Sequence, residues 1–383
     1  MKHPLDGVRI VDLTAYIAGS YTTALLGDLG ALVVKVESPA GDGFRMMAGS
    51  FQGWNRGKRA AIFDLTRDEG RGALYRMVRE ADVVVENYRP GVARKLGVDY
   101  DTLRAIKPDI VYCSVTGYGQ TGPSVKSPAF DPLMQSQSGA MHAQGGEGQP
   151  PVFLRVAITD YAAAIIAASG VAAALVHRAR TGEGQRLETS MVNAAVAIQA
   201  AEFMAYKGKQ APRRVGEMGV DATYRLYQAS DGWLFLSCRD DTSWTKAANV
   251  LGRPELAQRY PDAASRATND AALCKELEAV FKKGTAADWV GKLQAAGVRC
   301  ARSRVMLDFH DDAWAIARGL TVSADSPDAG PVKQMGPAIR FSDTPAIARG
   351  PAPGHGQHTD AVLAELGYSD ADIAALRYSG AVV

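Results

Sequence analysis

The sequence Val8-Arg9-Ile10-Val11-Asp12-Leu13 opens the part of the chain that decides its fold. Because this short run is rich in β-branched and apolar residues, it predicts a buried strand. A helix is expected around 20–29 and a second strand over 31–36. The alternation continues with predicted strands over 61–64, 82–85 and 110–115 and predicted helices near 68–80 and 99–106. Strands that alternate with helices form βαβ units, so residues 1–120 predict a Rossmann-like fold with a parallel sheet.

The length of 383 residues favours two domains, because a single hydrophobic core stops growing near ~250–300 residues. We predict an α/β protein with a large Rossmann-like domain over 1–190 and a smaller α+β domain over 215–305. A linker helix region over 191–214 joins them, within a stretch that is expected to be helical from 187 to 210. A C-terminal segment over 306–383 is expected to return to the large domain.

Composition disfavours several classes of function. A net charge of +2 gives no electrostatic basis for binding nucleic acid or a membrane surface. The four cysteines are scattered and form no C-x-x-C pair, so neither a disulfide framework nor a metal site is expected. A reducing, cytoplasmic location is therefore expected. Residues 1–6 lead straight into the first predicted strand, so no signal peptide is expected. The apolar run 161–176 is shorter than the ~18 residues of a membrane span, so no membrane partner is expected either.

Asp160 lies between a short apolar stretch over 152–159, expected to be a strand, and the Ala-rich run 161–176, expected to be a buried helix. At the start of that helix, free backbone N–H groups and the helix dipole are expected to hold the carboxylate ionised. An ionised, partly buried carboxylate can act as a nucleophile. The alternative interpretation is that Asp160 only caps the helix, since Asp is a preferred N-cap residue.

Several further motifs follow one another in order along the chain. They are L-D-G-V-R-I-V-D-L at 5–13, N-R-G-K-R at 55–59, V-E-N-Y-R-P-G at 85–91, D-Y-A-A at 160–163, T-G-E-G-Q-R at 181–186 and G-Q-H-T at 356–359. Together they resemble the CaiB/BaiF family, the class III CoA-transferases. The resemblance covers nearly the whole chain.

The resemblance implies an enzyme that moves CoA from an acyl-CoA donor to a carboxylic acid acceptor. Asp160 matches the family's acyl-accepting nucleophile, which would carry a covalent aspartyl-CoA intermediate. CoA thioesters would be substrates, with no tightly bound cofactor, and family members are interlocked homodimers. The positions that match the family's CoA-binding residues are Tyr16, Ile17, Ala18, Phe63, Leu65, Thr66, Asn87, Tyr88, Lys95, Leu96 and Phe130.

Two glycine-rich segments are candidates for the donors that acyl transfer needs. Gly117–Gly122 follows a predicted strand, where ligands bind in open α/β sheets, although it could also be a plain surface loop. It is not a G-x-G-x-x-G motif, so it does not predict a dinucleotide site. Gly145–Gly148 belongs to a flexible stretch that could be a hairpin tip or a lid. Backbone N–H groups of either loop could face the oxyanion of a tetrahedral intermediate.

The chain departs from two branches of that family. The formyl and oxalate members have a Gln at the position of Ile17 and an Arg at that of Ser38, so oxalate-type chemistry is disfavoured. Arg45 becomes the candidate for the contact with the CoA diphosphate. The α-methylacyl-CoA racemases have a His at the position of Phe130, and Phe cannot transfer a proton. The alternatives are thus a racemase or epimerase, which Phe130 disfavours, and an inactive CoA-binding relative, which the retained Asp160 disfavours.

Overall fold

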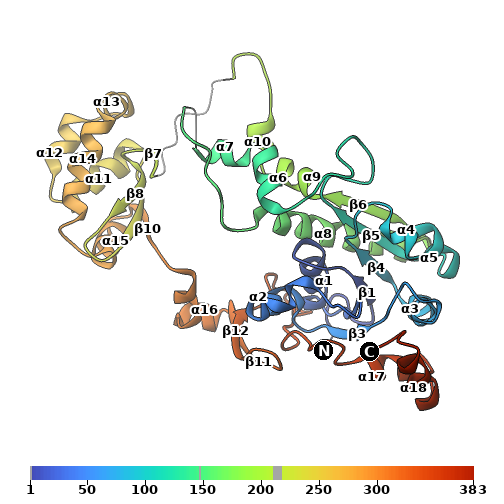
Figure 1. The fold of residues 1–383 in the computed structure, drawn as a ribbon. Helices are drawn as coiled ribbons and strands as arrows, with labels where there is room; N and C mark the ends of the chain where they lie inside the picture. The colour runs from blue at the N-terminus through green and yellow to red at the C-terminus, as the bar shows by residue number, and fades with distance from the viewer. Residues whose placement is uncertain (1, 146–147, 210–217) are drawn as a thin grey trace. The chain divides into compact units, whose positions relative to one another are not determined.

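The computed structural model describes residues 2–145, 148–209 and 218–383 (Figure 1). Parts of two expected features, the loop at Gly145–Gly148 and the linker over 191–214, lie outside these residues. The chain forms two compact units. The first combines Met1–Ser138, Leu154–Met204 and Phe309–Val383, and the second combines Gly139–Phe153 and Ala205–Asp308.

A six-stranded parallel sheet lies at the centre of the first unit. Its strands are β1 (Arg9–Leu13), β2 (Leu32–Glu37), β3 (Arg59–Ile62), β4 (Val83–Glu86), β5 (Val111–Thr116) and β6 (Arg186–Ser190). Their order across the sheet is β3-β2-β1-β4-β5-β6, and every neighbouring pair is parallel. The predicted α/β fold with a parallel, Rossmann-like sheet is therefore confirmed.

Strand β6 corrects the expectation that residues 187–210 form one helical stretch. Arg186 and Glu188 are exposed on this edge strand, and such a polar edge lacks the apolar signature of a buried strand. Ser190 ends the strand and caps the next helix, accepting a hydrogen bond of 3.2 Å from the N–H of Asn193. Up to residue 209, where this described range ends, two short helices follow, α9 (Met191–Ala197) and α10 (Ala200–Phe203).

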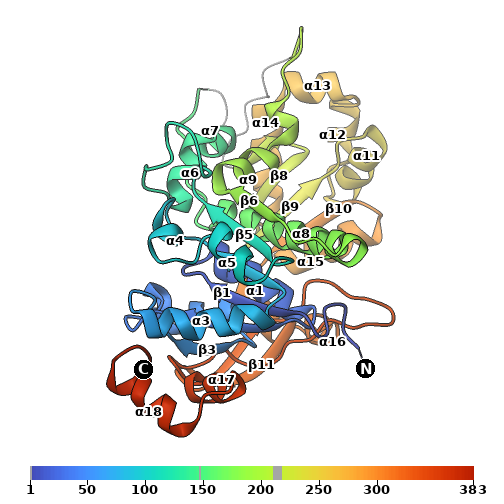
Figure 2. The same cartoon turned by 90° about the vertical axis from the view of Figure 1, so that its right-hand side faces the viewer.

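Helices cover both faces of the parallel sheet (Figures 1 and 2). Successive strand residues point to opposite faces, so Ile10 packs with the helices α1 and α8, whereas Val11 packs with α3 and α5. The helices of this part of the chain are α1 (Ala18–Asp28), η1 (Gly43–Met46), α2 (Ala48–Asn55), α3 (Asp68–Glu80), α4 (Val92–Lys95), α5 (Tyr100–Ile106), α6 (Asp131–Gln137) and α8 (Ile158–Thr181).

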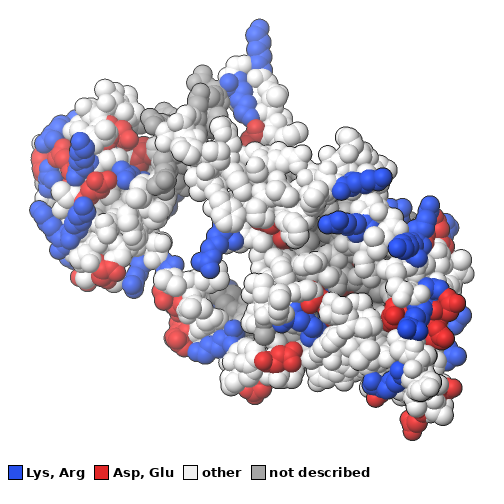
Figure 3. All heavy atoms as spheres, viewed as in Figure 1, with Lys and Arg blue, Asp and Glu red and all other residues white. Residues whose placement is uncertain are grey.

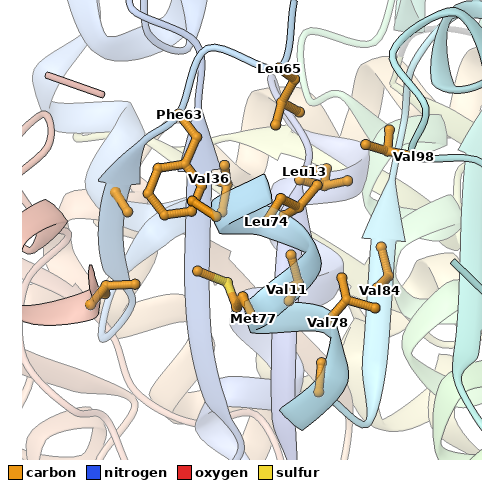
Figure 4. Packing of buried hydrophobic residues seen from close by; sticks show 14 of the residues in the cluster. Val11, Leu13, Val36, Phe63, Leu65, Leu74, Met77, Val78, Val84 and Val98 are labelled. Atoms are coloured by element: carbon orange, nitrogen blue, oxygen red, sulfur yellow. The ribbon is translucent and has the colours of Figure 1, made fainter. Parts of the chain in front are cut away.

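Figure 4 shows the core between the sheet and α3. Leu74 and Val78 lie four residues apart, on one face of the helix, and both are fully buried against Val11 and Val84 of the sheet. Burial of each such side chain stabilises the fold by about 1.5–3 kcal/mol. The opposite face of α3 carries charged residues, so its sequence alone orients the helix on the sheet.

Helix α8 begins at Ile158, so the last two residues of the stretch over 152–159 belong to this helix. The expected strand is wrong: residues 152–157 form no regular secondary structure, because no neighbouring strand pairs with them. The longer helix also corrects the expectation of a run too short to span a membrane. Over an 18-residue window the mean hydropathy of α8 is 1.6, so the helix is long and apolar enough to cross a membrane. This criterion uses length and composition alone, and core helices of soluble proteins also meet it. In this structure α8 packs on α1, β5 and β6.

The C-terminal segment lies against the first unit. The N–H of His358 donates a hydrogen bond of 2.9 Å to the carbonyl of Ala60 beside β3, and Val382 forms a bridge with Phe63. Gln52 donates a hydrogen bond of 2.7 Å to the hydroxyl of Ser326. The elements of this segment are η2 (Met306–His310), α16 (Ala313–Ala317), β11 (Thr321–Ser326), β12 (Gly330–Met335), α17 (Thr359–Glu365) and α18 (Asp370–Tyr378).

The second unit is an α+β structure with its own core. Its antiparallel sheet has the order β10-β9-β8-β7, and Tyr227 stacks on Phe281 with ring centroids 4.7 Å apart. The strands are β7 (Gly219–Asp221), β8 (Tyr224–Gln228), β9 (Trp233–Ser237) and β10 (Arg299–Ser303). The helices are α7 (Ala140–Gly145), α11 (Asp241–Val250), α12 (Pro254–Arg259), α13 (Ala263–Thr268), α14 (Asp270–Phe281) and α15 (Ala286–Ala295).

Candidate active site

A cavity of about 280 Å³ opens where the strand order of the parallel sheet reverses, between β1 and β4. The chain runs from β1 outward to β3 on one side and from β4 outward to β6 on the other. The loops that leave β1 and β4 therefore diverge, and ligands bind in the crevice between such loops. Seven of the predicted site residues line the cavity: Tyr16, Ile17, Ala18, Asn87, Tyr88, Phe130 and Asp160.

The other predicted CoA contacts lie elsewhere. Phe63 and Leu65 belong to the core cluster beneath α3, with 1% and 7% of their surface exposed, so their side chains have almost no surface to offer a ligand (Figure 4). Leu96 packs against the same cluster. Thr66 and Lys95 are exposed, and the Thr66 hydroxyl donates a hydrogen bond of 2.6 Å to Asp64. Contact of these residues with CoA stays a prediction.

Asp160 is the third residue of α8 and is half-buried at the wall of the cavity. The N-cap position of the helix is occupied by Ala157, which makes no side-chain cap. The interpretation of Asp160 as the N-cap of α8 is therefore wrong. Instead, its carboxylate lies near the backbone N–H of Ala18, the first residue of α1, which favours the ionised form of Asp160. The starts of two helices thus meet at this carboxylate.

A second carboxylate, that of Asp131 in α6, fixes the start of α8. It is buried and accepts hydrogen bonds of 2.8 Å from the N–H of Thr159 and 2.7 Å from its hydroxyl. Gln135 donates to the same carboxylate, and also donates a hydrogen bond of 3.0 Å to the carbonyl of Leu154. This role of Asp131 was not predicted, because the Asp-Pro pair that opens α6 marks a helix start but indicates no distant partner.

The environment raises the pKa of Asp160 from its ordinary value of 3.8 to about 7. Burial is the larger cause, the negative charge of Asp131 adds to it, and the N–H of Ala18 opposes both. The expectation of a carboxylate held ionised by its helix is therefore wrong near neutral pH, because burial and the neighbouring anion favour the protonated form. Asp160 titrates close to neutrality, as catalytic groups often do.

The candidate cations differ in whether they are free to meet a substrate. Arg45, expected at the diphosphate, pairs with Glu37, and its guanidinium lies 4.4 Å from the ring centre of Phe51. Lys58 is buried and donates to Asp12, among other partners, at 2.8 Å. Arg89 lies on the cavity wall, is exposed, and pairs with no acidic side chain that the structure describes. Arg89 is therefore the cation that this cavity offers to an anionic substrate.

The expected oxyanion donors are only partly available. The Gly117–Gly122 loop reaches the cavity through Gly117 and Gly119, but the N–H of Gly119 already donates a hydrogen bond of 2.9 Å to the hydroxyl of Thr116. The Gly145–Gly148 loop belongs to the second unit and is only partly described. The N–H of Ala18 is the donor that the structure places at Asp160, a role the sequence analysis did not assign to it.

Among the described residues, the cavity has no histidine where a racemase has its proton carrier. Phe130, at the position of the racemase histidine, is 57% exposed and lines the cavity with an apolar ring. No histidine is among the described residues that line the cavity, and His142 belongs to the second unit. In the described ranges, no group of three or more His, Cys, Asp and Glu side chains could hold a metal ion.

Comparison with known proteins shows the family of this chain. The chain belongs to CoA-transferase family III, whose family model matches residues 5–359, and it is a CoA-transferase. It is 33% identical to the succinyl-CoA:glutarate CoA-transferase of Mus musculus, over 99% of this chain and 90% of the relative. It is 34% identical to the succinyl-CoA:mesaconate CoA-transferase of Haloarcula hispanica, over 95% and 96%. A crystal structure of a CaiB/BaiF family protein from Brucella suis matches with a TM-score of 0.87 and 34% identity, over 96% of this chain and 100% of that one.

Proposed function

We propose that this CoA-transferase works through a covalent aspartyl-CoA intermediate on Asp160. The observation that carries the proposal is the position of this carboxylate. It lies in the cavity at the reversal of the strand order, with the N–H of Ala18 directed at it and with a pKa of about 7. A carboxylate of this kind is a better nucleophile than one with an ordinary pKa, and it is still ionised at mildly alkaline pH.

The reaction begins when a carboxylate oxygen of Asp160 attacks the thioester carbonyl of the donor. The C–S bond breaks, and CoA thiolate leaves an acyl-aspartyl anhydride. The thiolate then attacks the aspartyl carbonyl, which releases the donor acid and forms the aspartyl-CoA thioester. The acceptor carboxylate attacks that thioester, and the released thiolate attacks the acceptor's carbonyl in the new anhydride. Acceptor acyl-CoA leaves, and Asp160 is regenerated with no net loss of thioester energy.

The relatives suggest the class of acid for the first assays. Several are named for succinate, glutarate or mesaconate, all of which are dicarboxylic acids. Arg89, on the cavity wall with no acidic partner in the described residues, suits a second carboxylate on the acyl group. We therefore propose dicarboxylic acyl groups as substrates, with succinyl-CoA and glutarate as the first pair to test.

We also propose that the enzyme is a cytoplasmic homodimer whose two chains interlock. Ile165 and Val176 of α8 have 53% and 50% of their surface exposed in the single chain, and Ile166 has 37%. Apolar side chains exposed along one helix mark surfaces that partners cover. The distribution of charge gives no support to a nucleic-acid or membrane partner: on the face drawn in Figure 3, Lys and Arg side chains lie interspersed with Asp and Glu.

The test is a panel of acyl-CoA donors against carboxylic acids, with mass-spectrometric detection of new thioesters. The wild-type enzyme is expected to transfer CoA between at least one pair, whereas Asp160→Asn binds CoA and transfers none. Transfer by Asp160→Asn at the wild-type rate would overturn the role of Asp160. Absence of transfer from every donor would instead favour an inactive CoA-binding relative.

A further inference from the structure

The turn between β1 and α1 has an unusual backbone. Tyr16 has φ of 62°, and in the described ranges it is the only residue other than glycine with a positive φ. Such a conformation is unfavourable for a residue with a large side chain, so the surrounding structure must impose it. Tyr16 lines the cavity, and its turn leads directly into Ile17 and Ala18 at the start of α1.

Three side chains hold three successive residues of this turn. The buried amine of Lys35, in β2, donates a hydrogen bond of 2.6 Å to the carbonyl of Thr14. Asn87, beyond β4, accepts from the N–H of Ala15 at 2.9 Å and donates to its carbonyl at 2.7 Å. Asp42, before η1, accepts from the N–H of Tyr16 at 3.2 Å. The turn is therefore fixed from β2, from β4 and from η1 at once.

Asp42 and Lys35 form a buried ion pair across this turn. Their charged atoms lie 3.1 Å apart, and both side chains are almost completely buried. The oxygen of Asp42 that faces Lys35 has no hydrogen-bond partner among the described residues, whereas its other oxygen accepts from Tyr16 and, at 3.0 Å, from the N–H of Phe44. Buried ion pairs usually add little stability compared with well-packed apolar residues. The presence of the Asp42–Lys35 pair at a strained turn is therefore better explained by a role in holding the backbone of that turn than by a gain in stability.

We infer that Asp42, together with Lys35, is a positioning residue that holds the Tyr16 turn so that the N–H of Ala18 points at Asp160. This inference rests on the proposed role of Asp160 as the nucleophile. Without the acceptor at Asp42, the turn relaxes toward negative φ and the first turn of α1 rotates with it. The donor at Asp160 is then lost in the ground state and in the transition state, where such preorganised donors matter most.

The sign of the expected pH effect separates this role from a simple change of charge. The charged and titratable side chains around Asp160 are Asp131 from α6, Tyr16 from the β1 turn, Tyr88 and Arg89 from the β4 loop, and Tyr118 from the β5 loop. Removing the negative charge of Asp42 would favour ionisation of Asp160 and shift activity to lower pH. Losing the N–H of Ala18 disfavours ionisation, so the acid limb of the pH profile moves to higher pH.

The main test compares Asp42→Ala with Asp42→Asn, which keeps an oxygen that can accept from Tyr16. We expect kcat to fall about tenfold or more in Asp42→Ala and the acid limb of its pH profile to rise by about half a pH unit. In Asp42→Asn most of kcat is retained. Arg56→Met is the matched control, because Arg56 and Asp28 form another buried pair in the same unit, away from the turn.

A second variant guards against loss of folding. Lys35→Met combined with Asp42→Leu replaces the pair by apolar residues, which is expected to keep the protein folded and still to lower kcat and move the acid limb upward. A folded double variant with wild-type kcat and pH profile would overturn the inference, as would equal losses in Asp42→Ala, Asp42→Asn and Arg56→Met. Asp160→Asn is measured alongside. If it transfers CoA, the proposed function fails; if it is inactive while Asp42→Ala matches the wild type, only the positioning role fails.

Discussion

The carboxylate of Asp131 binds the residue immediately before the proposed nucleophile: it accepts from the N–H of Thr159 at 2.8 Å and from its hydroxyl at 2.7 Å. Asp131 thereby fixes the first turn of α8, on which Asp160 lies. The same negative charge raises the pKa of Asp160. One side chain therefore orients the nucleophile and, at the same time, makes it harder to ionise.

Replacing Asp131 by Asn separates these two effects. Asn keeps an oxygen that can accept from Thr159 but removes the charge, so the pKa of Asp160 falls and the acid limb of kcat/KM moves down by about half a unit to one unit. Asp131→Ala removes the acceptor as well, and we expect transfer to drop about 10- to 100-fold. Rates measured from pH 5 to 9 would count against this account if the Asn variant kept the wild-type acid limb.

Activity of the wild-type enzyme should depend on pH through Asp160 itself. Only the ionised carboxylate attacks, and its pKa is about 7, so kcat/KM is expected to fall about tenfold per unit below pH 7 and to level off above about pH 8. A limb with a midpoint near 4 would show that burial and Asp131 do not raise this pKa in solution.

Stability gives an independent check of the same pKa. Because the pKa of Asp160 is higher in the folded than in the unfolded chain, the folded state binds more protons between about pH 4 and 7, and this contribution to stability is lost as pH rises through that window. Asp160→Asn should therefore be more stable than the wild type at pH 8, by about 1 kcal/mol once partial exposure is allowed for, and the gain should shrink toward pH 4. Thermal unfolding at the two pH values measures the difference.

Racemisation is not expected. A racemase needs a proton carrier on each side of the α-carbon, and Phe130 supplies none. Incubation of a 2-methylacyl-CoA with the enzyme in deuterium oxide should give no more α-deuterium than incubation with Asp160→Asn. Uptake at a rate typical of enzyme turnover would move the chain to the racemase branch.

The dimer is testable through its kinetics. Interlocked chains cannot separate without local unfolding, so the dimer should persist at nanomolar concentration, and differently tagged dimers should not exchange subunits under native conditions. Sedimentation at low concentration and mixing of tagged proteins measure these two properties. A monomer, or exchange within minutes, would contradict the interlocked arrangement.

The local sequence was enough to predict those strands and helices that depend on the apolar pattern of their own residues. Five strands of the parallel sheet, and Asp160 at the start of a long helix, follow from apolar periodicity and helix signals. Strand β6 was not predicted, because Arg186 and Glu188 make it a polar edge strand. Such a strand is defined by its pairing with β5 and not by an apolar pattern in its sequence. The prediction of a strand over 152–159 was wrong for the opposite reason: its residues favour β-structure, but no strand pairs with them.

Contacts between residues that lie far apart in the sequence were also missed at the candidate site. Asp131 and Asp160 are 29 positions apart, and nothing in either local sequence indicates that one carboxylate controls the pKa of the other. Ala18 was assigned as a CoA contact, but its N–H also serves Asp160, because the starts of α1 and α8 converge. Phe63 was predicted to bind CoA, but its side chain lies in the core, because it follows β3 on the face that α3 covers.

The most direct measurement of the central claim is detection of CoA bound covalently to Asp160. The enzyme would be mixed with succinyl-CoA in the absence of an acceptor, quenched, digested and examined by mass spectrometry, with Asp160→Asn as the control. The account predicts a CoA adduct on the peptide that contains Asp160, which disappears when glutarate or another competent acceptor is added and is absent from the Asn variant. Efficient transfer with no adduct at Asp160 at any time in the reaction, or an adduct on another residue, would contradict it.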